Sequence, residues 1–79
     1  MTEKQQIEKT ANDVFSKMRL GWVIATVQEN LQSRTWDLEV QVPEGHELIL
    51  AVPHGSLKEI KEAIRQQTEE EMDRLESHR

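Results

Sequence analysis

One segment, WDLEVQV at positions 36–42, alternates strictly between apolar and polar side chains. Successive side chains of a strand point to opposite faces of a sheet, so this segment predicts a strand with one buried face and one exposed face. A sheet of this kind needs other elements to cover its apolar face. The side chains expected under that cover are Trp36, Leu38, Val40 and Val42.

Helical spacing on both sides of this strand predicts the cover. Apolar side chains recur at steps of three or four in residues 2–20 and again in residues 56–77. Each region opens with Thr or Ser followed three residues later by Gln or Glu, which is the spacing of a capping box at the start of a helix. The sequence therefore predicts helices over about residues 2–20 and 56–77.

Two further strands complete the expected fold. β-branched and aromatic residues fill most of 22–28, and an apolar run follows a Pro-Glu-Gly turn and ends at Pro53. We expect strands over about residues 22–28, 35–42 and 47–52. The order α-β-β-β-α then predicts one α+β domain over residues 1–79, a three-stranded antiparallel meander with both helices packed on one face.

Composition excludes several classes of function. The 79 residues include no Cys, which rules out disulfides, thiolate metal sites and thiol nucleophiles, and the formal net charge is −5. A negative field repels phosphate backbones and argues against general nucleic-acid affinity. No apolar run is long enough to span a membrane, and the N-terminus is polar. We expect an acidic cytoplasmic protein. The acidic excess lies mostly in Glu69, Glu70, Glu71, Asp73 and Glu76.

Catalytic and metal-binding constellations are not visible. His46 and His54 bracket the third predicted strand, and about 26 Å of extended chain keeps them from sharing a metal ion. Neither a nucleophile–base pair nor a glycine-rich phosphate loop is present. We therefore expect no enzyme activity, no metal and no cofactor. His54 precedes a helix N-terminus at Gly55-Ser56, which suits either an anion site or an ordinary helix cap.

Surplus apolar surface favours an interaction module. The second helix, roughly 33 Å long, should extend past strands of about 26 Å, so its last apolar side chains would project beyond the sheet. The third strand, at an edge, has no Lys to prevent pairing with another strand. We expect an adapter, chaperone-like protein or inhibitor that forms a homodimer through a sheet edge or face and also binds an unknown protein. Its expected contact residues are Val23, Ala25, Val27, Ile49 and Ala51 on the outer sheet face, and Met72 and Leu75 at the helix end.

A basic stripe supports a second hypothesis. Lys58, Lys61 and Arg65 are three and four residues apart on one helix face. Together with the α-β-β-β-α order, the alternating strand and the run GSLKEIKEA at 55–63, this stripe resembles the double-stranded RNA-binding domain. The resemblance implies phosphate contacts from Ser56, Lys58 and Lys61, although Leu57 occupies the position of that family's first lysine.

Double-stranded RNA is accordingly the alternative partner, bound through Arg34, Lys58, Lys61 and Arg65. The loop between the first two strands departs from the family's Gly-Pro-x-His pattern and reads Asn-Leu-Gln-Ser at 30–33. Glutamates also alternate with the lysines at 59 and 62, as on an ordinary salt-bridged helix surface.

Overall fold

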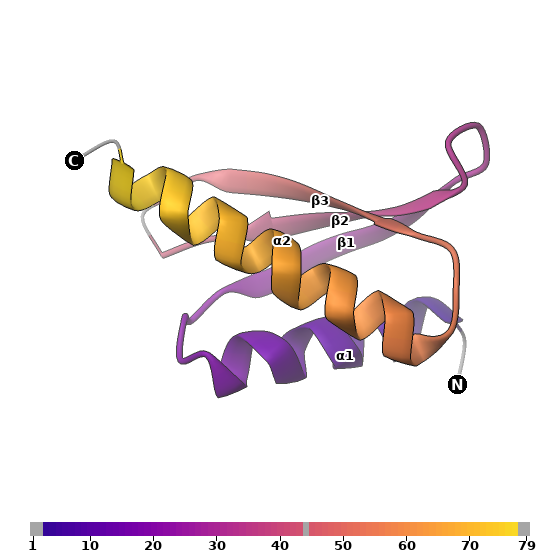
Figure 1. The fold of residues 1–79 in the computed structure, drawn as a ribbon, viewed down its shortest axis with the longest axis horizontal. Coiled ribbons are helices and arrows are strands. Elements are labelled where there is room, and N and C mark those ends of the chain that lie inside the picture. The colour runs from indigo at the N-terminus through magenta and orange to yellow at the C-terminus, as the bar shows by residue number, and fades with distance from the viewer. Residues whose placement is uncertain (1–2, 44, 78–79) are drawn as a thin grey trace.

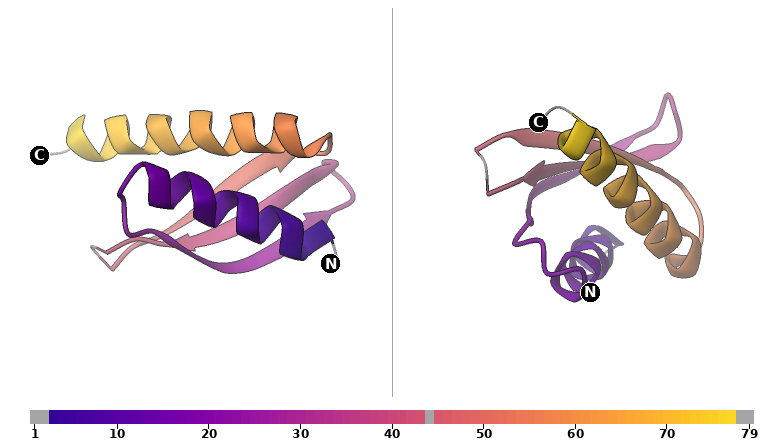
Figure 2. Two further views of the ribbon diagram at one scale, coloured as in Figure 1. Left: turned by 90° about the horizontal axis from the view of Figure 1, so that it is seen from below. Right: turned by 60° about the vertical axis from the view of Figure 1, so that its left-hand side comes forward.

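The computed structural model describes residues 3–43 and 45–77 and contains the predicted elements in the predicted order (Figure 1). They are α1 (Glu3–Lys17), β1 (Val23–Asn30), β2 (Thr35–Gln41), β3 (Glu47–Pro53) and α2 (Leu57–Ser77). The strands form one antiparallel sheet in the order β1-β2-β3, and both helices lie on the same face of it (Figure 2). The predicted α+β fold is confirmed. Thr2, the predicted first helical residue, lies outside the described residues.

The helix ends differ slightly from the prediction. α1 ends at Lys17 because Arg19 adopts a left-handed conformation, with φ of 56°. The N–H of Leu20 donates to the carbonyl of Phe15 at 3.2 Å, and that of Arg19 to Ser16 at 3.1 Å. These bonds form a Schellman motif, which stops a helix earlier than its apolar spacing suggests.

A serine cap starts α2 where the capping-box spacing placed it. The hydroxyl oxygen of Ser56 accepts the N–H of Glu59 at 3.3 Å. Its carbonyl accepts the first helical hydrogen bond, from Ile60, at 2.9 Å. Because this end of α2 follows β3 after a short connection, it lies beside the end of the sheet (Figure 1).

The core lies between the two helices and the inner face of the sheet. All four apolar side chains of the alternating segment are at most 5 % exposed, as the alternation predicted. At one end of the core the rings of Phe15 and Trp22 lie 5.5 Å apart. The buried apolar residues are Ile7, Ala11, Val14, Phe15, Trp22, Trp36, Leu38, Val40, Val42, Leu50, Val52, Ile60 and Ile64.

A β-bulge in β1 overturns one predicted contact residue. Ile24 pairs with Val40 and Thr26 with Glu39, so Ala25 between them has no partner in β2. One extra residue reverses the faces of all positions that follow it. Val27 therefore lies on the inner face, half-buried against the core, and its predicted place on the outer face is wrong.

The far end of α2 also differs from the prediction. Met72 and Leu75 are half-buried and pack against the core rather than projecting past the sheet. α2 crosses the strands obliquely (Figure 1), and the diagonal of a sheet is longer than a strand. The extra length of the helix is thereby accommodated over the sheet.

Candidate interaction surfaces

The outer face of the sheet, which neither helix covers, is polar and acidic. Its large apolar side chains are Val23, 52 % exposed, and Ile49, 71 % exposed. Ala25 and Ala51 are exposed but small. The side chains of this face are Val23, Ala25, Thr26, Gln28, Asn30, Thr35, Asp37, Glu39, Gln41, Glu47, Ile49, Ala51 and Pro53. The expected broad apolar area is therefore reduced to an isolated Ile49 and a more peripheral Val23.

Three carboxylates surround Ile49. Glu39 lies directly opposite it on β2, Asp37 lies two pairs further along, opposite Ala51, and Glu47 lies two residues before it on β3. A hydrogen bond to Glu39, and then the charge of Glu39, raise the pKa of Glu47 above its usual value. We call Ile49 with Asp37, Glu39 and Glu47 the acidic face.

The free edge of β3 is partly occupied by α2. The N–H of Ala51 donates to Oε1 of Gln67 at 3.1 Å, and Nε2 of Gln67 donates to the carbonyl of Ala51. Every second residue of an antiparallel edge strand turns its backbone groups outward, which here means Glu47, Ile49 and Ala51. With Ala51 bonded, a partner strand could pair only with the first two.

The free edge of β1 carries the bulge at Ala25. A bulge interrupts the regular ladder and increases the local twist, and natural sheets use bulges to prevent pairing between edges. Both edges of this sheet are therefore modified against strand addition, although neither carries a protective Lys in its sequence.

The basic stripe on α2 is only partly available. The Arg65 guanidinium lies 2.8 Å from Glu62 and 3.1 Å from Glu69, so both of these carboxylates pair with it. The hydrogen bond and charge of Arg65 lower the pKa of Glu62. Lys58 and Lys61 are exposed and form no ion pair with a described residue.

Arg34 lies near the start of α2. It is the last residue of the loop between β1 and β2 and has a φ of 54°. Its carbonyl accepts the N–H of His54 at 3.1 Å, which joins the loop to the segment before α2. The structure thus places Arg34 at the same end of the molecule as Lys58, whereas Arg65 is held by its glutamates.

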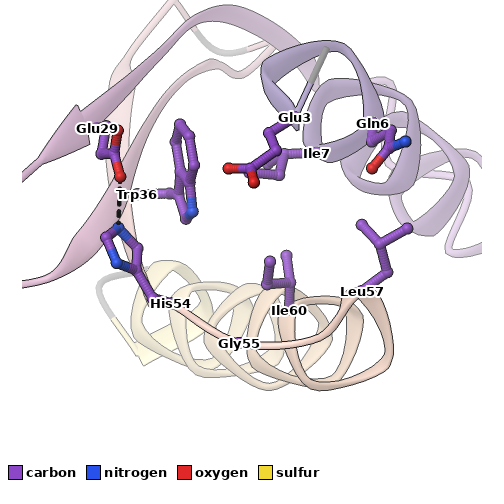
Figure 3. Close-up of a pocket in the computed structure, with 9 residues that line it drawn as sticks. All are labelled: Glu3, Gln6, Ile7, Glu29, Trp36, His54, Gly55, Leu57 and Ile60. Carbon is purple, nitrogen blue, oxygen red and sulfur yellow. Dashed lines mark ion pairs between the residues drawn. The ribbon is translucent and has the colours of Figure 1, made fainter. Parts of the chain in front are cut away.

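A cleft of about 330 Å³ lies at this same end, on the helix side of the sheet (Figure 3). The first turns of both helices, the ends of β1 and β2 and the connection between β3 and α2 contribute to it. Figure 3 shows the carboxylate of Glu3 and the ion pair of Glu29 with His54 on either side of the Trp36 ring. Ile7 and Ile60 supply apolar walls.

The bulge explains why the cleft is acidic. Glu29 pairs with Trp36, so its side chain points to the inner face, and its carboxylate lies 3.2 Å from Nε2 of His54. The rings of His54 and Trp36 lie 5.6 Å apart. Sequence reasoning missed this group because it assigned Glu29 to a loop and Trp36 to the core alone. A carboxylate beside His54 also disfavours the anion site considered for that end of α2.

Comparison with protein-family models, curated proteins and solved structures finds no match to this chain. The resemblance to the double-stranded RNA-binding domain stays a prediction. Within residues 3–43 and 45–77, no three His, Asp or Glu side chains are grouped to hold a metal ion. In the same part of the chain, neither helix has the length and apolar character needed to cross a bilayer.

Proposed function

We propose that this chain is a protein-interaction module whose acidic face docks on a basic surface of a partner protein. The observation that carries this proposal is the 71 % exposure of Ile49 among three carboxylates. Specific interfaces commonly bury a few apolar anchors within a polar rim that excludes water. Ile49 has the position of such an anchor.

Charge indicates the chemistry of the partner. Asp37, Glu39 and Glu47 lie on the same face and no Lys or Arg belongs to it. Complementary potentials accelerate association and exclude partners of the same sign. The partner surface should therefore present Lys or Arg side chains around an apolar pocket that accepts Ile49.

Self-association through the acidic face is less favourable by the same argument. Two copies that met there would bring like charges together. The two strand edges are modified by Gln67 and by the bulge at Ala25. The expected homodimer stays a prediction, and a partner of opposite charge accounts better for the acidic face.

Affinity capture from native extract tests the proposal. The immobilised chain should retain a partner, the Ile49→Ala variant should lose it, and Leu31→Ala should keep it. Leu31 is a matched control because it is 76 % exposed but lies in the loop between β1 and β2. With the purified partner, calorimetry should show about 30-fold weaker binding for Ile49→Ala, and affinity should fall as salt is added.

Three outcomes would contradict the proposal. The first is no retained partner. The second is equal retention by the Ile49→Ala and wild-type chains. The third is retention of double-stranded RNA that nuclease abolishes and that depends on Lys58 and Lys61, which would favour the RNA-binding alternative.

A further inference from the structure

The cleft at the helix N-termini is lined by a hydrogen-bond donor that has no partner among the described residues. Trp36 is 5 % exposed, and its indole N–H points into the cleft (Figure 3). It donates to no described residue, although its ring contacts that of His54. No buried side-chain N or O atom of the described residues lacks a hydrogen-bond partner, so this N–H is open to the cleft. It can therefore donate to an acceptor atom of a ligand that enters the cleft.

The charges around Trp36 indicate that the ligand is a cation. The carboxylates of Glu3 and Glu29 come from α1 and β1, on opposite walls. Among the described residues that line the cleft, none is Lys or Arg. Glu3 forms no ion pair with a described residue, and Glu29 pairs only with a half-exposed His54. A cation would therefore find uncompensated negative charge beside an aromatic ring, the combination that binds ammonium and guanidinium groups.

Shape favours a guanidinium over a small ammonium ion. A guanidinium is planar and carries five N–H donors, so one group can bridge carboxylates on two walls while it lies against an aromatic ring. The cleft volume of about 330 Å³ is at the lower end of the range for small-ligand sites, which suits one side chain rather than a large cofactor.

We propose that the cleft binds a guanidinium group, with Glu3 and Glu29 as its carboxylate partners and Trp36 as its aromatic wall. The N–H of Trp36 then donates to an acceptor next to the guanidinium, such as a peptide carbonyl. This group belongs either to an arginine residue of a peptide or to a free guanidine. The site lies on the helix side of the sheet, so it does not depend on the acidic face.

Nuclear magnetic resonance of the ¹⁵N-labelled chain tests this site directly. N-acetyl-arginine amide should shift the indole N–H signal of Trp36 and leave that of Trp22 in place. Trp22 is an internal control because it packs on Phe15, at the opposite end of β1 from Glu29. The isosteric but neutral N-acetyl-citrulline amide should shift neither signal.

Variants and a second probe identify the partners and the source. Glu3→Gln should weaken binding of N-acetyl-arginine amide about fivefold, while Glu8→Gln, the same charge change on the exposed side of α1, should not. Weaker binding of methylguanidinium than of N-acetyl-arginine amide supports a peptide arginine, and equal binding supports a free guanidine.

An unmoved Trp36 signal, an equal response to the citrulline probe, or equal weakening by Glu8→Gln would overturn the proposal. Ile49→Ala should leave every one of these shifts unchanged, which separates this test from that of the acidic face.

Discussion

Glu39 and Glu47 place two carboxylates within hydrogen-bond reach on neighbouring strands. A carboxyl beside another carboxylate holds its proton more tightly, because protonation relieves repulsion and supplies a hydrogen bond. The folded state therefore binds the proton of Glu47 more tightly than the unfolded chain does. By linkage, the resulting stabilisation is full below the ordinary glutamate pKa of 4.5 and is lost as pH rises through the raised pKa.

This sign gives a prediction at the scale of one residue. Glu47→Gln removes the repulsion, so at neutral pH the variant should unfold at a higher temperature than the wild-type chain. The difference should disappear in acid, where Glu47 is protonated in both states. Thermal unfolding followed by circular dichroism at several pH values measures it. Glu70→Gln, an exposed glutamate on α2, is the control, and an equal gain there would contradict this explanation.

At the scale of elements, the bulge in β1 separates what could be predicted from what could not. Periodicity predicted both helices, all three strands and the buried face of β2, because burial on one face imposes a spacing on the sequence. The bulge at Ala25 leaves no periodic pattern in the sequence, since a small residue is compatible with a bulge and with a regular strand. Without the bulge, strict alternation assigns Val27 to the wrong face and does not bring Glu29 to Trp36.

Interactions between distant segments were also beyond sequence reasoning. The contact of Gln67 with Ala51 joins residues 16 positions apart, and nothing in the local pattern distinguishes Gln67 from Gln66. The ion pairs of Arg65 follow helical spacing and agree with the expected salt-bridged surface. The sequence therefore predicts the salt-bridged surface of α2, because its residues are close in the chain. It does not predict the contact between α2 and the edge of β3, because those residues are far apart in the chain.

The reversal of faces in β1 can be tested with two identical substitutions. Val27→Asn should lower the free energy of unfolding by about 1–3 kcal/mol, because it places an amide against the core. Val23→Asn should change it by less than about 0.5 kcal/mol, because Val23 faces water. Strict alternation would assign both residues to the same face. Chemical denaturation measures both variants, and equal losses would contradict the reversal.

At the scale of the whole molecule, the chain has one covered sheet face and one open face. Its charge of −5 and the carboxylates of the acidic face oppose contact between two open faces. Gln67 and the bulge reduce pairing at the two edges. The free edge of β3 and the outer face of the sheet first suggested a homodimer. In the structure, a helix side chain occupies part of that edge and carboxylates surround the apolar side chain on that face.

Removal of Gln67 should restore an edge that can pair. Gln67→Ala should lower the free energy of unfolding by about 1 kcal/mol and raise the fraction of dimer seen by sedimentation at high micromolar concentration. Gln66→Ala, its exposed neighbour, should change neither quantity. If Gln67→Ala sediments like the wild-type chain, the contact with Ala51 is not what limits strand addition.

The carboxamide of Gln67 contains the same amide group as one peptide unit. At Ala51 it supplies the donor and the acceptor that a fourth strand would have provided at that rung. The carboxamide can leave Ala51 by rotation of one side chain, whereas a paired strand leaves only when several backbone hydrogen bonds break. An extended segment that pairs with Ala51 must therefore first displace a single glutamine, so strand addition at this position depends on one rotamer.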